Sequence, residues 1–437
     1  MTGFFKKLWR DKRGNALVIA AAALPLVIGS AGLASDTIQW ALWKRQLQRA
    51  ADSGAIAGVY AIVQDEGSRG NVTTAVDRDL THNSHIGYTT TKVVGAPTSG
   101  SYTADPYAVQ VQLSVQKKLS FSGMFMSYIP TITATATATV TPSGNYCVVS
   151  LEDTSTTGIT MTGNATVNLG CGMITNSTSM TAAVATGSSA VTSSPIAAVG
   201  GIAASNNWGS GTILQPFTLA QEDPFKNVPP PPMPSSGNCP QYRKNNQNQG
   251  PWTFSATDAN TSGLPAGYYC VSDIDINSTV TFPSDSVIII DGGNFNIGGQ
   301  AHVSCTRCTF VLTSRDAATN PADIGVANIN GGAELDLVAN NSGTYSGLII
   351  YQDRRAIDDG SANTTNLING NSDSSFQGAF YFPSQRTTVN GTAGMSTACV
   401  KLVARRVDFS GNMNISNTCP SNSGVPDFTG KKVRLVE

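Results

Sequence analysis

The distribution of charged and apolar residues predicts one long N-terminal helix. Residues 16–35 contain no charged side chain and consist mainly of Ala, Leu, Val and Ile. At about 1.5 Å per residue, a helix over this run spans roughly the 30 Å hydrocarbon core of a bilayer. After Asp36 the chain continues to about Val63 without proline and is rich in good helix formers. We therefore expect a membrane segment that continues as a helix outside the membrane.

The flanks of the uncharged run predict its orientation. Residues 1–13 contain five Lys or Arg residues and one acid, and basic flanks stay in the cytoplasm. Residue 36 onward should then lie on the far side of the membrane from the cytoplasm, with membrane lipid as one partner. Trp9, Trp40 and Trp43 are expected at the lipid–water interface, which indole rings favour. The predicted membrane anchor comprises Ala16, Leu17, Val18, Ile19, Leu24, Pro25, Leu26, Val27, Ile28 and Leu33.

A cleavable signal peptide is the alternative interpretation of this segment. A basic stretch, an apolar stretch and the small residues Gly32 and Ala34 are typical of such peptides. Cleavage after Ala34 would release a soluble periplasmic protein. The helical pattern that continues beyond Asp36 favours a retained anchor.

A stripe of mostly small residues follows at helical spacing. We interpret it as a face that packs on the chain's own domain, and a face for a partner helix in the membrane plane is the alternative. The stripe consists of Leu47, Ala50, Ala51, Gly54 and Ala57.

Between residues 85 and 141 the hydrophobic period changes from helical to two. Residues 109–116 alternate Val or Leu with Gln or Ser, which predicts a half-buried strand. Residues 131–141 alternate Thr with Ile, Ala and Val, and a shorter run covers residues 89–94. A long helix followed by about three strands predicts an α+β module over residues 36–142.

Beyond residue 145 the chain contains an internal repeat that reads apolar, polar, Gly, any, small, any, apolar. Copies begin at Met161, Ile297, Ile329, Val389 and Phe409, and a looser copy begins at Ile276. The spacing from Gly391 to Gly411 is 20 residues. Short strands with this period and Gly or Asn at the bends predict a parallel β-helix over residues 143–437. A β-sandwich with Gly-rich hairpins is the alternative.

Two segments interrupt the repeat. Residues 223–238 are rich in proline and are expected to cross the surface as an extended connection. Residues 183–206 are rich in Ala, Ser and Gly without a clear pattern, and we expect a poorly ordered loop there. The predicted domains are a basic flank and membrane helix over 1–35, the α+β module, and the β-rich region.

The composition fits a protein outside the cytoplasm. Only 13% of the residues are charged and the net charge is −1, where soluble globular proteins average about 25% charged residues. This balance gives no reason to expect nucleic acid as a partner.

All eight cysteines lie between Cys147 and Cys419, which predicts disulfides and an oxidising compartment. In a β-helix, cysteines 20 to 31 residues apart fall on adjacent turns, about 4.8 Å apart and within disulfide range. A redox or zinc role for the C-x-x-C pair is the less favoured alternative. The expected pairs are Cys147 with Cys171, Cys239 with Cys270, Cys305 with Cys308, and Cys399 with Cys419. The pair in C-x-x-C requires a turn, because three residues of extended strand span about 10 Å.

No motif for catalysis, cofactor binding or metal binding stands out. The chain lacks a phosphate loop, a nucleophile elbow and a zinc-protease helix, and has three histidines. Residues 153–157 are similar to a metal-ion-dependent adhesion motif, but the β-type repeat follows instead of a helix. A charged cluster, Asp353, Arg354, Arg355, Asp358 and Asp359, could serve a lyase, and we interpret it as a solvated loop. We therefore predict no enzyme, no cofactor and no metal.

The N-terminal 65 residues resemble the TadE/TadG-like family of Flp (Tad) pilus-assembly proteins. The resemblance rests on Arg13-Gly14-Asn15, Pro25, Gly32-Leu33-Ala34, Asp36, Leu47-Gln48 and Ala50-Ala51-Asp52. Flp-type prepilins carry Glu at the fifth residue of the mature chain, and the corresponding residue here is Ile19. The chain therefore resembles the larger, uncleaved TadG-like member more than a pilin subunit.

The resemblance implies a non-enzymatic, single-pass component of a Tad/Flp pilus assembly and adhesion system in the bacterial inner membrane. Pilus-assembly or envelope proteins are its expected partners. The alternative is a periplasmic or surface β-helix protein that binds carbohydrate or acts as a polysaccharide lyase. The long helix followed by about three strands over residues 36–142 has the outline of a pilin-like module, and any small α+β domain is the alternative.

Overall fold

The structure of the protein is a computed structural model. It describes residues 12–65, 67–83, 91–231, 253–254, 268–371, 373–391, 399–411, 413–414 and 419–436. The chain folds into two compact units. Unit 1 contains the chain up to Thr141 together with the C-terminal residues from Lys432 on, and unit 2 is Pro142–Lys431. No pattern in the sequence predicts the C-terminal return to unit 1.

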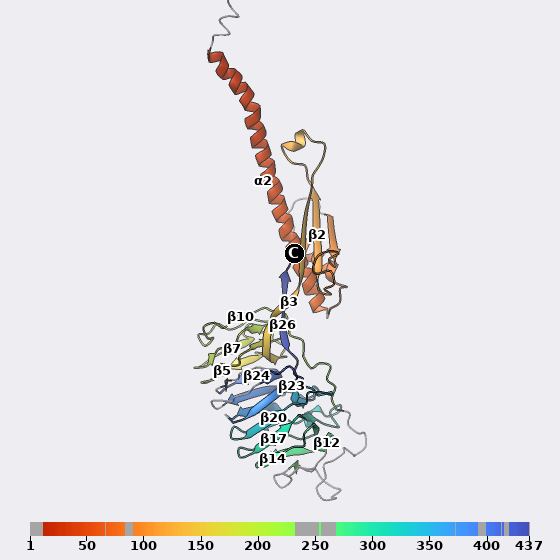
Figure 1. The fold of residues 1–437 in the computed structure, drawn as a ribbon, viewed down its shortest axis with the longest axis vertical. Coiled ribbons are helices and arrows are strands. Elements are labelled where there is room, and N and C mark those ends of the chain that lie inside the picture. The colour runs from red at the N-terminus through yellow and green to blue at the C-terminus, as the bar shows by residue number, and fades with distance from the viewer. Residues whose placement is uncertain are drawn as a thin grey trace, which may run out of the picture. The chain divides into compact units, whose positions relative to one another are not determined.

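Unit 1 is built on one long helix, α2 (Lys12–Gln64), which continues through Pro25 (Figure 1). Its first half exposes a series of large apolar side chains, which water would solvate poorly. These side chains are exposed by 54–75%: Val18, Ile19, Leu24, Leu26, Val27, Ile28 and Leu33. Trp9 and the side chains of Ala16 and Leu17 lie outside the described residues. The segment is long and apolar enough to cross a membrane.

The second half of α2 packs on the rest of unit 1. A short helix, α3 (Val72–His82), follows it, and the strands are β1 (Thr91–Gly95), β2 (Val109–Gln116) and the first part of β3 (Thr131–Ser150). β2 pairs antiparallel with both β1 and β3. The strand expected over 109–116 is present, and α3 has no counterpart among the predicted elements.

The small-residue stripe of α2 faces this sheet. Leu47 and Ala51 are fully buried, and a Cβ on Gly54 would stand 3.3 Å from a methyl group of Val76 in α3 and 3.7 Å from one of Val111 in β2. The stripe therefore packs on its own unit, as the favoured interpretation expected. The last strand, β26 (Phe428–Leu435), adds Val433 and Leu435 to the same core.

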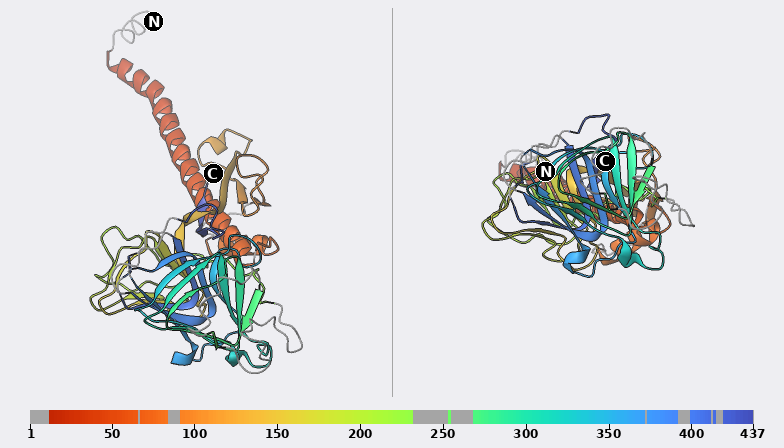
Figure 2. Two further views of the ribbon diagram at one scale, coloured as in Figure 1. Left: turned by 60° about the horizontal axis from the view of Figure 1, so that its bottom comes forward. Right: turned by 90° about the horizontal axis from the view of Figure 1, so that it is seen from below.

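In unit 2, parallel strands lie next to one another in stacks. The strands of a stack are seen one above the other in Figure 1 and side by side in Figure 2. The first stack has the order β12–β15–β18–β21–β23–β24–β3–β6–β9–β10. Their bounds are β12 Tyr268–Val271, β15 Ser286–Asp291, β18 Cys308–Thr313, β21 Leu348–Gln352, β23 Ser375–Gly391, β24 Cys399–Phe409, β6 Gly172–Thr175, β9 Ile196–Ala198 and β10 Leu214–Gln215.

The second stack has the order β11–β13–β16–β19–β22–β23–β24–β4–β7. Its further strands are β11 Thr253–Phe254, β13 Asp273–Ile276, β16 Phe295–Ile297, β19 Ala327–Ile329, β22 Thr365–Gly370, β4 Ile159–Met161 and β7 Ala183–Ala185. β23 and β24 are long enough to take part in both stacks.

The remaining parallel strands form a third group. β14 (Thr279–Thr281), β17 (His302–Thr306) and β20 (Glu334–Val338) lead to the start of β23. A small separate sheet contains β5 (Thr166–Asn168), β8 (Ala190–Val191) and β25 (Met413–Asn414). Short 3-10 turns occur at η1 (Ser122–Met124), η3 (Pro321–Asp323) and η4 (Ala362–Thr364).

The repeat found in the sequence corresponds to one interior row of the second stack. The first apolar residue of each copy is paired with the equivalent residue on the next turn. A bend follows each of these residues. The row contains Ile276, Ile297, Ile329, Ile368, Val389, Phe409, Met161 and Ala185. Parallel pairing throughout differs from the antiparallel sheets of the β-sandwich alternative.

The chain enters this stack in its middle. β3 lies between β24 and β6, so residues 142–215 continue one end of the stack, and residues 268–409 build the other end. The expectation of a poorly ordered loop over residues 183–206 was wrong. That segment forms β7, β8 and β9, because its Ala and Val residues fill the narrow interior rows.

Candidate functional site

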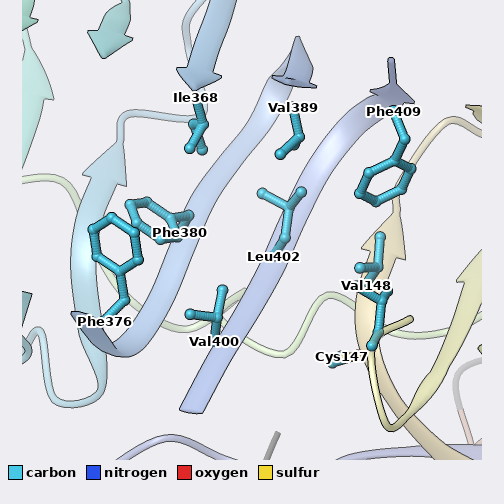
Figure 3. Close-up of a pocket in the computed structure, with 10 residues that line it drawn as sticks. Cys147, Val148, Ile368, Phe376, Phe380, Val389, Val400, Leu402 and Phe409 are labelled. Carbon is cyan, nitrogen blue, oxygen red and sulfur yellow. The ribbon is translucent and has the colours of Figure 1, made fainter. Parts of the chain in front are cut away.

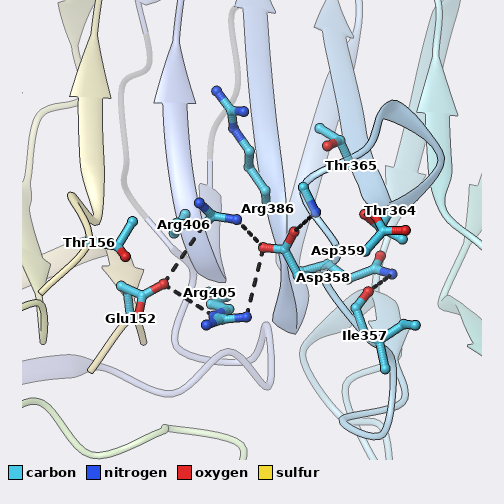
Figure 4. A network of polar contacts seen from close by, with 12 residues as sticks. Glu152, Thr156, Ile357, Asp358, Asp359, Thr364, Thr365, Arg386, Arg405 and Arg406 are labelled. Carbon is cyan, nitrogen blue, oxygen red and sulfur yellow. Dashed lines mark hydrogen bonds and ion pairs between the residues drawn. The ribbon is translucent and has the colours of Figure 1, made fainter. Parts of the chain in front are cut away.

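Unit 2 contains a network of ion pairs in which the carboxylates are buried (Figure 4). Arg405 and Arg406 lie on β24, Glu152 follows β3, and Asp358 lies in the loop after β21. Parallel pairing of β24 with β3 and β23 brings these segments together. Arg405 Nε donates to Glu152 Oε2 at 3.1 Å, and Arg406 donates to Asp358.

Both carboxylates of this network are buried, with side-chain exposures of 1% for Glu152 and 0% for Asp358. A buried charge is costly unless it is paired and hydrogen-bonded. The second oxygen of Glu152 also accepts bonds from the backbone N–H and the hydroxyl of Thr154, at 3.1 and 2.6 Å. Guanidinium and hydroxyl donors thus occupy the positions from which a substrate proton would approach. The network joins strands, and its geometry does not suit acid–base chemistry.

The interpretation of residues 353–359 as a solvated loop was wrong for the side chains of Asp353 and Asp358. Asp353 is fully buried and accepts hydrogen bonds from Thr313 Oγ1 at 2.8 Å and from Arg355. Burial raises the pKa of the Asp353 carboxyl, but the bonds from Arg355 and Thr313 outweigh it and hold the pKa below its usual value. Arg355 and Asp359 remain exposed. Two of the three acids, Asp353 and Asp358, therefore organise the loop from inside.

Arg354 of the same loop holds the Pro-rich connection against the sheet. We call residues 222–231 the strap. Arg354 donates to the backbone carbonyls of Lys226, Phe225 and Val228 at 2.8, 3.1 and 3.2 Å. The described part of the predicted surface connection over 223–238 thus lies on the outer face of the first stack, and residues 232–238 lie outside the described residues.

Tyrosines on the outer face of the first stack form the surface beneath the strap. Tyr351 and Tyr381 stack with ring centroids 5.3 Å apart. Tyr381 donates to Asp223 at 2.7 Å, and Tyr351 donates to the carbonyl of Val228 at 3.2 Å. Burial raises the pKa of Tyr351 to about 12, and burial and Asp223 raise the pKa of Tyr381. Both rings therefore remain neutral donors to the strap at physiological pH.

An open polar groove lies on the outer face of the second stack. Its volume is about 680 Å³. Asn296, Asn328 and Thr388 project into it because they alternate with interior residues such as Ile297. Asn296 and Asn328 are one turn apart, and Leu367 occupies the turn between Asn328 and Thr388. Arg386 also lines the groove and is paired with Asp408. Amide and hydroxyl groups in such rows are suited to hydrogen-bond a polar, uncharged polymer.

The apolar hollow in Figure 3 is a packing gap in the interior. It has a volume of about 30 Å³, which is the space of about one water molecule. Its lining is apolar, so it offers no hydrogen-bond partner for a ligand. The lining consists of Cys147, Val148, Leu169, Ile368, Phe376, Phe380, Val389, Val400, Leu402 and Phe409.

The metal-adhesion-like residues 153–157 lie in the bends between β3 and β4. The strand β4 follows them, where the adhesion motif needs a helix. Asp153 is exposed, and its neighbour Glu152 is the acid that points inward. Among the described residues, no group of three or more His, Cys, Asp or Glu side chains is arranged to hold a metal ion.

Disulfides link residues close in the sequence, as the sequence spacing suggested. The bonds are Cys147–Cys171, Cys305–Cys308 and Cys399–Cys419, with Cα separations of 5.8, 5.9 and 4.5 Å. The required turn in C-x-x-C occurs at Arg307, whose φ of 57° separates β17 from β18. Cys270 is also disulfide-bonded, and its expected partner Cys239 lies outside the described residues.

The two tryptophans after the uncharged run differ in their surroundings. Trp40 is 44% exposed. Trp43 is partly buried, and Lys117 Nζ lies 4.8 Å from the centre of its ring. Lys117 belongs to the connection between β2 and β3, which contains the apolar stretch from Phe121 to Ile129. This stretch was not among the predicted site residues, although so apolar a strand connection is itself an unusual signal.

Asp36, the acid of the family-like pattern, is 3% exposed. Its carboxylate accepts the backbone N–H groups of Phe121 and Ser122, at 2.9 and 2.5 Å. Asp36, the first charged residue after the uncharged run, thus holds the connection between β2 and β3 on α2.

Comparison with known proteins identifies one family. No curated protein and no solved structure matches the chain. Residues 14–61 match the family model described as "Putative Flp pilus-assembly TadE/G-like" (Tad). The matched residues lie within α2 and include its exposed apolar half, Asp36 and the buried stripe. The match confirms the resemblance inferred from the residues: residues 14–61, which lie in α2, are similar to the TadE/G-like pilus-assembly domain.

Proposed function

We propose that the protein is a membrane-anchored, non-enzymatic component of a Tad/Flp-type pilus assembly and adhesion system. The observation that carries this proposal is the family match over residues 14–61. The exposed apolar side chains of the same helix support anchoring, since lipid would cover them. Pilus-assembly or envelope proteins are the proposed partners of the remaining chain.

The proposed topology places the N-terminus in the cytoplasm and the bulk of the chain in the periplasm or outside the cell. Five basic residues before Gly14 support this orientation in the inner membrane. The disulfides also support it, because they persist in oxidising compartments.

The proposed architecture has three parts: a basic flank and membrane helix over 1–35, a pilin-like α+β module over 36–142, and a parallel β-helix from residue 143 to Lys431. The C-terminal residues from Lys432 on belong with the α+β module. Support for the β-helix comes from the strand stacks, in which residues one repeat apart, such as Ile276 and Ile297, are paired in parallel. Such a fold exposes long regular faces suited to contact with other envelope components.

Phosphatase fusion tests the topology and the signal-peptide alternative together. Alkaline phosphatase fused after residue 70 should be active, because the fused enzyme needs the oxidising side of the membrane. The fusion should also sediment with membranes. An inactive fusion would contradict the orientation, and an active fusion in the soluble fraction would establish a cleaved signal peptide.

A second candidate function is carbohydrate binding in the polar groove of the second stack. The rows of Asn296, Asn328 and Thr388 favour it. The lyase form of this alternative has no support, because the buried acids Glu152 and Asp358 are paired with arginines and are not among the residues that line the groove.

Gene deletion with complementation tests the proposed function. Loss of the protein should abolish or strongly reduce both Flp pili on the cells and surface attachment, and the full chain should restore both. The variant Asn328→Trp fills the groove from an exposed position. If the groove binds carbohydrate for adhesion, this variant should restore pili without attachment. Normal pili in the deletion strain would contradict the assembly role.

A further inference from the structure

The connection between β2 and β3, residues 117–130, exposes an unusual cluster of large apolar side chains. We call this connection the hairpin tip. Met124 and Phe125 are each 76% exposed, Tyr128 68%, Met126 51% and Ile129 41%. Exposed apolar patches of this kind in a connection mark an interaction site or a membrane contact.

The hairpin tip is held at a defined position along the axis of α2. Besides the two N–H bonds to Asp36, the Ser120 hydroxyl donates to Gln39 Oε1 at 3.1 Å. A Cβ on Gly32 would overlap the ring of Phe121, so the missing side chain of Gly32 makes room for that ring. Figure 1 shows η1 of the tip beside α2. The tip is therefore a fixed part of unit 1.

This position coincides with the end of the uncharged run. Gly32 lies inside residues 16–35, and Asp36 is the first charge after them. At about 1.5 Å per residue, Gly32 is roughly 6 Å deeper along the helix than Asp36. The Phe121 ring contacts α2 at this depth, and Phe125 packs against Phe121 with centroids 5.4 Å apart. The apolar surface of the helix thus continues onto the tip.

The order of residues in the tip matches the layers of a membrane surface. Lys117 and Lys118 come first, next to the end of β2, and the apolar residues follow. Lysines favour the head-group layer, aromatic rings favour the boundary, and Met, Phe and Ile favour the acyl region. A soluble protein partner would not require this order at this position.

We propose that the hairpin tip is a second membrane contact, inserted into the lipid–water interface of the outward-facing leaflet beside α2. The inference rests on the proposed membrane anchor. With two attachments, the helix and the tip, lipid restricts the tilt and rotation of unit 1. Asp36 acts as the link, because it satisfies two backbone donors at the base of the tip.

Photo-crosslinking in native membranes tests this inference on the full chain. Benzoylphenylalanine is placed singly at Phe125, at Leu24 in the membrane run, or at Val93. Val93 is 61% exposed on β1 and is paired with Gln112, well before the tip. We expect lipid adducts at Leu24 and Phe125, with roughly tenfold or more adduct at Phe125 than at Val93, because insertion replaces water by lipid.

The positions separate the two proposals. Lipid adducts at Leu24 together with protein adducts, or none, at Phe125 would overturn the tip inference and leave the anchor intact. A lack of lipid adducts at Leu24 would refute the anchor and the inference with it. Equal lipid labelling of Phe125 and Val93 would also overturn the inference, because the contact would then not be specific to the tip.

Discussion

Replacing Arg406 by methionine should destabilise unit 2 by about 3–5 kcal/mol, because it leaves a buried carboxylate without its main partner. Asp358 has a side-chain exposure of 0%, and after the change its nearest cation would be Arg405 Nη1, at 4.0 Å. Methionine retains much of the volume of the arginine stem, so the loss of unfolding free energy reports on the missing charge and not on a cavity. For a unit of this size, the thermal midpoint should fall by roughly 6–10 °C.

Thermal unfolding of the full chain in detergent, followed by circular dichroism at one scan rate, measures the effect. The matched control is Arg307→Met, since Arg307 pairs with Asp285 at the surface, with both side chains more than 40% exposed. Exposed pairs contribute about 0–1 kcal/mol, so this variant should shift the midpoint little. Adding Asp358→Asn to Arg406→Met should restore part of the loss. Equal midpoints for Arg406→Met and Arg307→Met would show that the network does not join the strands.

Features encoded in local periodicity could be predicted from the sequence. The alternation over residues 109–116 identifies β2 with the bounds observed, because each residue's face follows from its neighbours. The uncharged run and the absence of proline after Asp36 predict one helix, and α2 ends at Gln64. The repeat predicts the interior row from Ile276 to Phe409, because each bend follows its apolar residue by local turn preference.

Features that depend on distant contacts could not be predicted in this way. β24 pairs with β3 through residues such as Leu402 and Val148. The repeat does not predict this neighbour, because its pattern would be the same beside any other turn. The charged cluster shows the same limit on a smaller scale. Asp358 and Asp359 are adjacent, yet the Asp358 side chain is buried and Asp359 is exposed. Arg406 decides the difference from 48 residues away.

The chain needs a connection such as the strap because it enters the first stack in the middle, at β3. After β10 the chain must return to the other end of the stack to begin β12, and the strap is part of that return. It contains no regular hydrogen-bonded strand, so its position depends on side chains. Phe225 is 4% exposed and packs edge-on against Tyr381 and Phe428, with centroid distances of 5.4 and 6.0 Å.

Replacing Phe225 by alanine should therefore release the strap without unfolding the stacks. Removing a buried Phe costs about 3–5 kcal/mol. If the strap opens locally, a loss of this size raises the equilibrium population of the open strap by a factor of roughly a thousand, since each 1.4 kcal/mol changes an equilibrium constant tenfold. Lys226 is exposed and adjacent, so trypsin should cut after it far faster in the variant. Mass spectrometry of brief digests measures the rate at this bond.

The matched control is Ile213→Ala, which shortens a side chain that is 58% exposed beside β10. It should leave cleavage after Lys226 unchanged, because Ile213 lies outside the strap. Faster cleavage after Lys226 with an unchanged thermal midpoint in Phe225→Ala would place the lost energy in a local opening. A lower midpoint with no change in cleavage would show instead that the strap and the stacks unfold as one. Slow cleavage with an unchanged midpoint would show that Arg354 and the tyrosines hold the strap without the Phe225 ring, since their bonds reach the same carbonyls.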